Sequence, residues 1–280
     1  MKKKTVLVTG AAGGVGGHLR PLLAARYDLV LSDVRLLPDR ARGERFRRAD
    51  LARAADVARV TKGVDAIVHL GGYSVEGPWD AILEANIVGA YNLFEAARRH
   101  GIKRVVFASS HHAVGFHRRD RRIDHMADVR PDTRYGVSKV FGEALGRLYA
   151  DKYGLEVFCI RIGNVNPAPI DKRRLSLWSS PRDLAQLVSI GVDHPDVRFE
   201  IVYGVSGNHR TFYDNANAAR LGYRPLDDSE PHAAALLARE PPGDPIAELY
   251  QGGPFTVSET IPNPAARTPA KRTQRKKTRR

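Results

Sequence analysis

The sequence predicts an α/β fold, in which one doubly wound parallel sheet carries a small C-terminal substrate cap. Three observations predict it. Short apolar runs alternate with helical segments from residue 5 to residue 162, a glycine-rich turn follows the first run, and the alternation becomes irregular beyond Asn164. Parallel strands joined by right-handed helical crossovers place helices on both faces of such a sheet. A chain of 280 residues can bury a core without disulfides or metals.

The elements follow in order from the hydrophobic pattern. Runs of four to seven mostly aliphatic residues, bounded by glycine or polar residues, are typical of buried strands, and longer segments between them are typical of helices. The predicted strands cover residues 5–10, 28–33, 46–49, 65–70, 104–110, 157–162 and 199–203. The predicted helices cover residues 15–25, 52–61, 79–100, 135–153 and 181–190. The proline-containing stretch after Asn164 is expected to form either a substrate lid or ordinary surface loops.

The positive charge is concentrated at the C-terminus. Residues 263–280 carry eight basic and no acidic side chains, which is more than half of the formal net charge of +14. This segment lacks the apolar content to fold, so we expect a disordered basic tail. The predicted units are therefore a dinucleotide-binding domain at 1–165, a small cap with late sheet elements at 166–262, and the tail at 263–280. Nucleic acid is a possible partner only through this tail.

Cysteine content and hydropathy narrow the setting. Cys159 is the only cysteine, so no intramolecular disulfide forms, which fits a reducing cytoplasm. Residues 5–17 are interrupted by glycines and do not form the apolar core of a signal peptide. No apolar run approaches the length needed to span a bilayer, so we expect a cytoplasmic protein without a membrane partner.

The first candidate site is the turn that contains Gly10, Gly13 and Gly16, between a predicted strand and a predicted helix. Glycines there let the backbone approach a pyrophosphate, whose charge meets the amides of the helix N-terminus. Asp33, at the end of the second strand, can accept hydrogen bonds from a ribose diol and would repel a 2′-phosphate. The pattern therefore favours NAD over NADP, and Arg35 nearby weakens the preference slightly. The alternative is a glycine-rich turn beside a solvated carboxylate.

The second candidate site combines Tyr135, Lys139 and Ser110. Positions four apart share one face of a helix, so the Lys139 ammonium is expected to lie near the Tyr135 phenol. An adjacent cation favours phenolate and lowers the tyrosine pKa towards working pH, as a general base requires. Ser110 ends the preceding strand, where ligands of such sheets bind.

Together these residues resemble the short-chain dehydrogenase/reductase superfamily, in its extended, epimerase-like branch with a Rossmann fold. More narrowly, residues 5–255 resemble bacterial NAD-dependent uronate dehydrogenases. The stretches that carry this likeness are residues 71–76, 86–89, 108–112, 135–143, 161–163 and 174–178. The nucleotide motifs are shared by many relatives, and the stretches around Ser74, His112 and Trp178 narrow the choice.

The resemblance implies a role for each matching position. Tyr135 is implied as the base, Lys139 as its activator and ribose ligand, and Ser110 as the partner of the reacting hydroxyl. The implied cofactor site, for NAD, comprises Gly10, Gly13, Val15, Gly16, Asp33, Asp50, Leu51, Leu70, Gly71, Asn86, Tyr135, Lys139 and Ile162. The implied substrate site comprises Ser74, Ser110, His111, His112, Tyr135, Asn164 and Arg173.

Within that substrate site Arg173 is implied to face the sugar carboxylate, which a guanidinium matches with two parallel donors. The sequence departs from the family at His111, where the family has asparagine, and at Asn164, where it has serine. Those changes leave the redox chemistry intact and bear on sugar preference. Trp178 is either packing or recognition.

The expected activity is oxidation of the anomeric hydroxyl of a hexuronic acid, glucuronate or galacturonate, to an aldarolactone by a homo-oligomeric enzyme. The alternatives are a nucleotide-sugar epimerase or dehydratase of the same branch, and a non-catalytic NAD-sensing or nucleic-acid-binding protein. No metal site is expected. His111 and His112 would point in opposite directions on a strand, and the resembled family needs no metal.

Overall fold

The computed structural model describes residues 3–37, 39–41, 44–239 and 243–259; the predicted basic tail at 263–280 and the last cap residues, 260–262, lie outside them. Seven parallel strands form one sheet in the order β3-β2-β1-β4-β5-β6-β9. Their bounds are β1 Thr5–Thr9, β2 Asp28–Ser32, β3 Arg45–Phe46, β4 Ala66–His69, β5 Arg104–Ser110, β6 Glu156–Ile162 and β9 Phe199–Gly204. The strand order reverses between β1 and β4, so the predicted doubly wound fold is confirmed.

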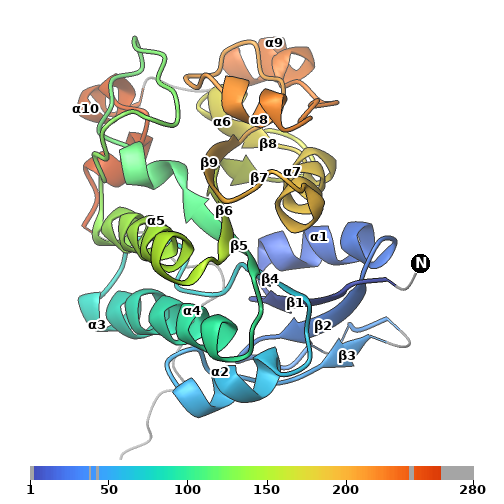
Figure 1. Cartoon of the computed structure of the whole chain (residues 1–280). Coiled ribbons are helices and arrows are strands. Elements are labelled where there is room, and N and C mark those ends of the chain that lie inside the picture. The colour runs from blue at the N-terminus through green and yellow to red at the C-terminus, as the bar shows by residue number, and fades with distance from the viewer. Residues whose placement is uncertain (1–2, 38, 42–43, 240–242, 260–280) are drawn as a thin grey trace, which may run out of the picture.

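Helices cover both faces of this sheet (Figure 1). On one face lie α1 (Gly14–Ala24) and α7 (Pro181–Asp193), and on the other lie α2 (Ala54–Thr61), α4 (Gly89–Arg99) and α5 (Arg134–Tyr153). Side chains of β1 alternate between the two apolar cores: Val6 and Val8 join the α1 side, and Leu7 joins the α4 side. A strand buried on both faces is why β1 reads as a continuous apolar run.

The helix predicted over residues 79–100 is not regular throughout. It is built of α3 (Trp79–Ile82), a π-helical segment η1 (Leu83–Val88) and α4. The extra residue of a π-helical turn re-aims the side chain it carries, here Asn86. The Asn86 carboxamide accepts from the Tyr73 amide at 2.6 Å and donates to the Ser138 hydroxyl at 2.9 Å. It therefore ties the loop after β4 to α5.

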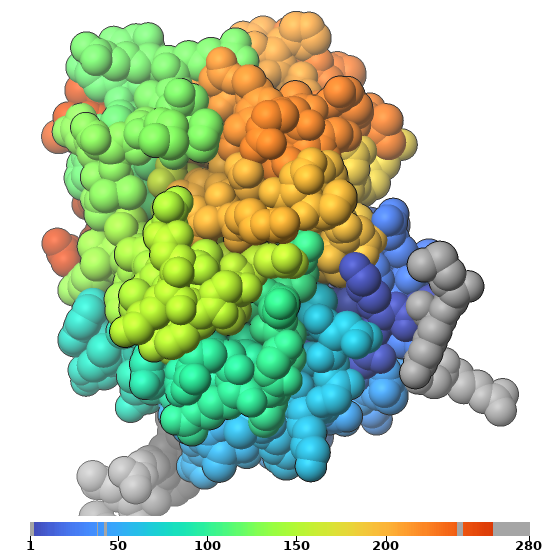
Figure 2. Space-filling model, in the orientation of Figure 1, coloured from blue at the N-terminus to red at the C-terminus, as the bar shows by residue number. Residues whose placement is uncertain are grey.

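Apart from α7 and β9, the elements after β6 lie beyond the main sheet, in the region predicted as the cap. Strands β7 (Asn164–Val165) and β8 (Trp178–Ser179) pair in parallel, and α6 (Arg174–Leu177), α8 (Ala216–Arg220) and α9 (Ala233–Leu237) lie near them, with α10 (Pro245–Leu249) to one side (Figure 1). The segment after β5 packs on these late elements. Green residues of that segment and orange residues near α8 lie side by side in Figure 2. One hydrogen bond between them runs from the Ile123 amide to the Phe212 carbonyl, at 2.9 Å.

Helix α5 is fixed at several points. The Thr133 side chain caps its N-terminus by accepting from the Gly136 amide, and Gly154 ends it at φ 70°. One turn beyond Lys139, the buried Glu143 carboxylate accepts two bonds from Arg161 of β6, at 2.9 Å each. A paired, hydrogen-bonded buried charge holds its neighbours in one register. In the described part of the chain, no helix is long and apolar enough to cross a membrane.

Candidate active site

A cleft of about 820 Å³ opens at the carboxyl ends of β1, β4 and β5. It collects nearly all the predicted site residues although they come from segments far apart in the sequence. The predicted residues that line it are Gly10, Gly13, Val15, Gly16, Asp33, Asp50, Leu51, Leu70, Gly71, Ser74, Ser110, His111, His112, Tyr135, Lys139, Ile162, Asn164 and Arg173. Asn86 is the exception, because its side chain lies behind the cleft against Tyr73 and Ser138.

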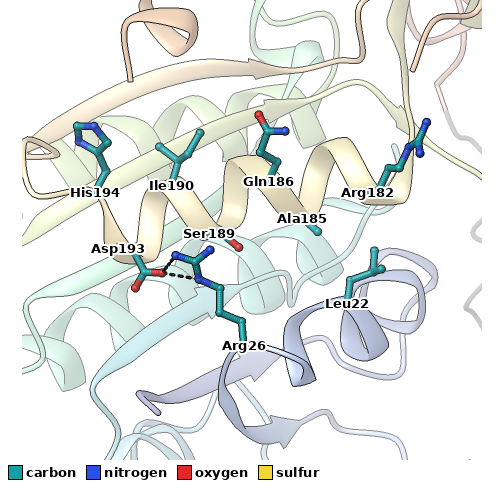
Figure 3. Close-up of a pocket in the computed structure, with 9 residues that line it drawn as sticks. All are labelled: Leu22, Arg26, Arg182, Ala185, Gln186, Ser189, Ile190, Asp193 and His194. Atoms are coloured by element: carbon teal, nitrogen blue, oxygen red, sulfur yellow. Dashed lines mark hydrogen bonds and ion pairs between the residues drawn. The ribbon is translucent and has the colours of Figure 1, made fainter. Parts of the chain in front are cut away.

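A second hollow, of about 490 Å³, lies between α1 and α7 (Figure 3). Figure 3 shows the Arg26 guanidinium directed at the Asp193 carboxylate. Their charged atoms are 2.7 Å apart, so the two groups form an ion pair. Arg182 in turn pairs with Asp227. None of the predicted site residues lines this hollow.

Two positions of the glycine-rich turn have no room for a side chain. Gly10 has φ 69°, and a Cβ on it would lie 2.7 Å from the Gly71 amide nitrogen. A Cβ on Gly16 would lie 2.5 Å from the Gly10 carbonyl oxygen. Gly13, the N-cap residue of α1, has no side chain to accept from the first amides of that helix, and both Gly13 and Gly14 line the cleft. Such amides and the positive end of the helix suit a pyrophosphate.

Asp33 is held at the end of β2 by backbone donors. Its carboxylate accepts from the Ala12 amide at 3.0 Å and from the Arg35 amide at 2.9 Å. The Arg35 guanidinium donates to the Ala12 carbonyl and lies 3.6 Å from the Asp33 carboxylate. The Arg35 guanidinium is anchored to the Ala12 carbonyl of the glycine-rich turn, so it lies beside the Asp33 carboxylate and leaves that carboxylate in place. The donor and acceptor set fits an adenosine ribose diol.

Tyr135 and Lys139 lie one turn apart on α5, and both are buried. The Lys139 ammonium is 5.4 Å from the centroid of the Tyr135 ring and donates to the Ala108 carbonyl at 2.9 Å. Burial raises the pKa of Tyr135 to about 12, and a side-chain hydrogen bond with Ser110 opposes the rise. The expected lowering of the tyrosine pKa is therefore wrong for this arrangement, because desolvation of the phenolate is the largest effect and the nearby Asp132 charge adds to it. Burial lowers the pKa of Lys139 to about 8.

His111 and His112 were expected to lie on a strand, but β5 ends before them, at Ser110. They begin a 3₁₀ turn, His111–Val114, in which both rings are buried with centroids 3.9 Å apart. The strand argument for opposite directions is thus wrong. Burial lowers the pKa of both imidazoles, which keeps them neutral. Across the described ranges, no cluster of three or more His, Cys, Asp or Glu residues is placed to hold a metal.

Arg173 forms a cationic wall of the cleft. Its Nη2 donates to the Gly252 carbonyl at 2.7 Å and to the Gln251 carbonyl at 3.3 Å, and lies 3.5 Å from His111 Nε2. Neutral carbonyls orient the guanidinium without cancelling its charge, so it remains suited to an anion in the cleft. Burial lowers its pKa to about 10, which leaves it charged at neutral pH.

Three residues that contact predicted site residues were not themselves predicted. Glu76 is buried and accepts from the Tyr135 amide at 2.9 Å and from the Arg134 guanidinium. Asp132 contacts His112, and the Phe255 ring stacks on the His112 ring with centroids 3.9 Å apart. Glu76 follows Ser74 in the same stretch, which is a usable signal, whereas nothing in the sequence brings Phe255 to His112.

Trp178, which the sequence left open between packing and recognition, is 3% exposed. Its indole nitrogen donates to the Asn166 carbonyl at 2.8 Å, and its ring meets His232 edge-on. It does not line the cleft. The geometry favours a packing role, in which Trp178 joins β8 to the loop after β7.

Known proteins share this architecture. Residues 6–175 match the model of the NAD dependent epimerase/dehydratase family. The chain is 45% identical over 256 residues to a uronate dehydrogenase of Pseudomonas putida, covering 90% of this chain and 96% of that protein. It is 43% identical to a glucuronic acid dehydrogenase structure from Chromohalobacter salexigens, with a TM-score of 0.89 and coverage of 91% of this chain and 97% of that chain.

A third relative was solved with a cofactor. It is a mutant uronate dehydrogenase of Agrobacterium tumefaciens complexed with NAD, 41% identical, with a TM-score of 0.87 and coverage of 90% of this chain and 97% of that chain. Together, the matched family model, the likeness over nearly the whole length of these relatives and the cleft geometry lead to one conclusion: this chain belongs to the NAD-dependent epimerase/dehydratase family of short-chain dehydrogenases/reductases.

Proposed function

We propose that this protein is an NAD-dependent dehydrogenase that oxidises the anomeric hydroxyl of a hexuronic acid to an aldarolactone. One observation carries the proposal: the Arg173 guanidinium lines the same cleft as the Tyr135 phenol and the glycine-rich turn. The cleft thus combines an anion-binding wall, a proton-transfer group and a dinucleotide site. The uronate dehydrogenases of P. putida and A. tumefaciens support the choice of substrate class.

The residues present fit NAD. At Gly10 and Gly16 a Cβ would collide with neighbouring backbone, so glycine allows the tight turn that lines the cleft, and Asp33 is held where it can accept from a ribose diol. Lys139 and Tyr135 would hold the nicotinamide ribose. The remaining walls of the proposed cofactor site are Gly13, Val15, Asp50, Leu51, Leu70, Gly71 and Ile162.

In the proposed reaction Tyr135 Oη, as phenolate, takes the proton of the anomeric hydroxyl. Bound NAD supplies the hydride acceptor and a positive ring charge beside the phenol. Because burial keeps the Tyr135 pKa high, the ammonium of Lys139 and the hydroxyl of Ser110 must favour the phenolate at the moment of transfer. Ser110 also orients the substrate oxygen, and the carbon that loses hydride becomes the lactone carbonyl.

Arg173 would bind the carboxylate of the sugar and so hold the anomeric carbon towards Tyr135. Such a clamp acts by positioning, because it converts a free encounter into one geometry. The sugar hydroxyls would meet Ser74, His111, His112 and Asn164, which line the same part of the cleft. At His111 an imidazole replaces the asparagine of the resembled family, which changes the shape and donors offered to the sugar.

A substrate screen tests the proposal. Formation of NADH is followed by absorbance with glucuronate, galacturonate, glucose, galactose, glucose 6-phosphate and UDP-glucose. We expect stoichiometric NADH with a uronate and at least tenfold lower kcat/KM with a neutral aldose, because a charge-assisted pair stabilises the bound state by roughly 1.5–3 kcal/mol. Preferred turnover of glucose 6-phosphate would assign Arg173 to a phosphate, and conversion of UDP-glucose without net NADH would establish an epimerase.

We further propose the wider context of this activity. Residues 1–165 would be the cofactor-binding unit and 166–262 the substrate cap. The single cysteine supports a cytoplasmic setting. A homo-oligomer is our expectation from the resemblance to its family. The basic tail, residues 263–280, would be the only route to nucleic acid, through salt-sensitive contacts with phosphates.

A further inference from the structure

Asp132 lies at the junction of three parts of the active site. It directly precedes Thr133, the residue that caps α5, and its Oδ1 accepts from the Thr133 hydroxyl at 3.0 Å. Its Oδ2 lies 2.7 Å from His112 Nδ1. The side chain is completely buried, and a Cβ on either Gly115 or Gly252 would collide with it. The carboxylate therefore has one position and one imidazole to hold.

Three rings and the Asp132 carboxylate contact the His112 ring. Phe255 stacks on it with centroids 3.9 Å apart at 25°, and His111 lies at the same centroid distance. The Tyr135 ring meets it edge-on at 5.9 Å. Nδ1 is the nitrogen that Asp132 engages, so Nε2 is the nitrogen left for the cleft that His112 lines. One bond thus decides which nitrogen carries the proton.

We infer that Asp132 is a positioning residue that fixes His112 as the Nδ1–H tautomer, so that Nε2 presents a lone pair to a hydroxyl of the bound sugar. A carboxylate that accepts from one imidazole nitrogen makes the other nitrogen an acceptor and orients the ring. The inference rests on the proposed function for the identity of the sugar, but not for the state of the ring.

Charge and burial agree with this assignment. Burial lowers the pKa of His112, so the ring is neutral and has one proton to place. Burial raises the pKa of the Asp132 carboxyl to about 7, while the Thr133 hydroxyl and the Arg173 charge favour its ionised form. In neutral to alkaline solution an ionised Asp132 accepts the proton of Nδ1. The neighbouring cation Arg173 repels a second proton on the ring and leaves Nε2 an acceptor.

Replacing Asp132→Asn tests the inference by steady-state kinetics on the full chain. We expect the KM for the uronate to rise about tenfold while kcat changes less than threefold, because the amide can donate to Nδ1 and move the proton to Nε2. Deoxy-uronates that lack one hydroxyl each provide the discriminating readout. The wild type loses affinity for one of them, and the variant does not distinguish that analogue from the parent sugar.

Two controls separate positioning from structural damage. Asp120→Asn removes an exposed carboxylate from the same segment and should leave KM and thermal stability unchanged. In a His112→Gln background Asp132→Asn should have little further effect on KM, since the residue would act through the ring. An equal loss of kcat with all sugars, or full additivity of the two substitutions, would overturn the inference.

Nitrogen-15 NMR of histidine-labelled protein gives an answer that does not depend on turnover. The His112 signals are assigned by their disappearance in His112→Gln. We expect a protonated Nδ1 and a bare Nε2 in the wild type, reversed in Asp132→Asn. The same tautomer in both proteins contradicts the inference even if uronate oxidation is confirmed. If the tautomers are as expected but no uronate is oxidised, the proposed function is refuted, and the inference about Asp132 and His112 is still supported.

Discussion

The two halves of the cleft are built by different means. The cofactor half depends on backbone contacts. Gly10 and Gly16 allow the turn to pack closely on neighbouring backbone, and the Asp33 carboxylate accepts hydrogen bonds from two backbone amides. The sugar half uses side chains from distant segments, in which Arg173 is oriented by carbonyls near residue 252 and His112 by Asp132 and Phe255. The backbone constraints restrict the residue type to glycine and so leave a motif in the sequence. The side-chain constraints leave no such motif, because they depend on which segments meet in space.

We expect the two halves of the cleft to differ in their tolerance to amino-acid substitution. In the cofactor half a single added methyl collides with backbone atoms that cannot move, as at Gly16. In the sugar half Arg173 and His112 are oriented through the ends of their side chains, so we expect a substitution of either to change which ligand is held.

Tyr135→Phe gives the largest expected effect, because Tyr135 stands where the two halves meet. We expect kcat to fall about 10²–10⁴-fold with little change in NAD affinity, since only the proton acceptor is removed. Stopped-flow NADH formation and cofactor titration measure the two quantities. Tyr153→Phe, an exposed tyrosine of the same helix, is the matched control. Retention of the wild-type rate in Tyr135→Phe would remove Tyr135 from the chemistry.

Arg173→Ala tests the sugar half alone. We expect kcat/KM for the uronate to fall roughly 10–100-fold, because a charge-assisted contact of about 1.5–3 kcal/mol is lost. The kcat/KM for a neutral aldose should change far less. Arg147→Ala, which removes an exposed arginine of α5, controls for net charge. Equal losses with charged and neutral sugars would exclude a carboxylate clamp.

Asp33→Asn tests the cofactor half and has the smallest expected effect. We expect the KM for NAD to rise up to about tenfold and the KM for the uronate to stay constant, since a neutral amide accepts more weakly from a ribose diol. Asp28→Asn, at the opposite end of β2, is the control. The double substitution with Arg173→Ala should be additive within about 0.5 kcal/mol. Strong coupling would show that the halves do not act independently.

Much of the fold was predictable because its signals are local. A hydrophobic run predicted the strand at 104–110, and glycines predicted the turn at Gly10. The alternation of such runs with helices predicted the parallel sheet. The helix at 79–100 was predicted as one unit, and its π-helical segment was not, because a one-residue insertion leaves the apolar pattern almost unchanged.

The site divides in the same way. Sequence by itself predicted the fold class, the glycine-rich turn, Asp33, and the spacing of Tyr135 and Lys139, because each leaves a pattern of residue types along the chain. Only the tertiary structure decided that His111 and His112 form a turn, that burial raises the Tyr135 pKa, and that Asp132 and Phe255 restrain His112. Desolvation and ring contacts arise from segments that meet only after folding, and no pattern along the chain records which of them will meet.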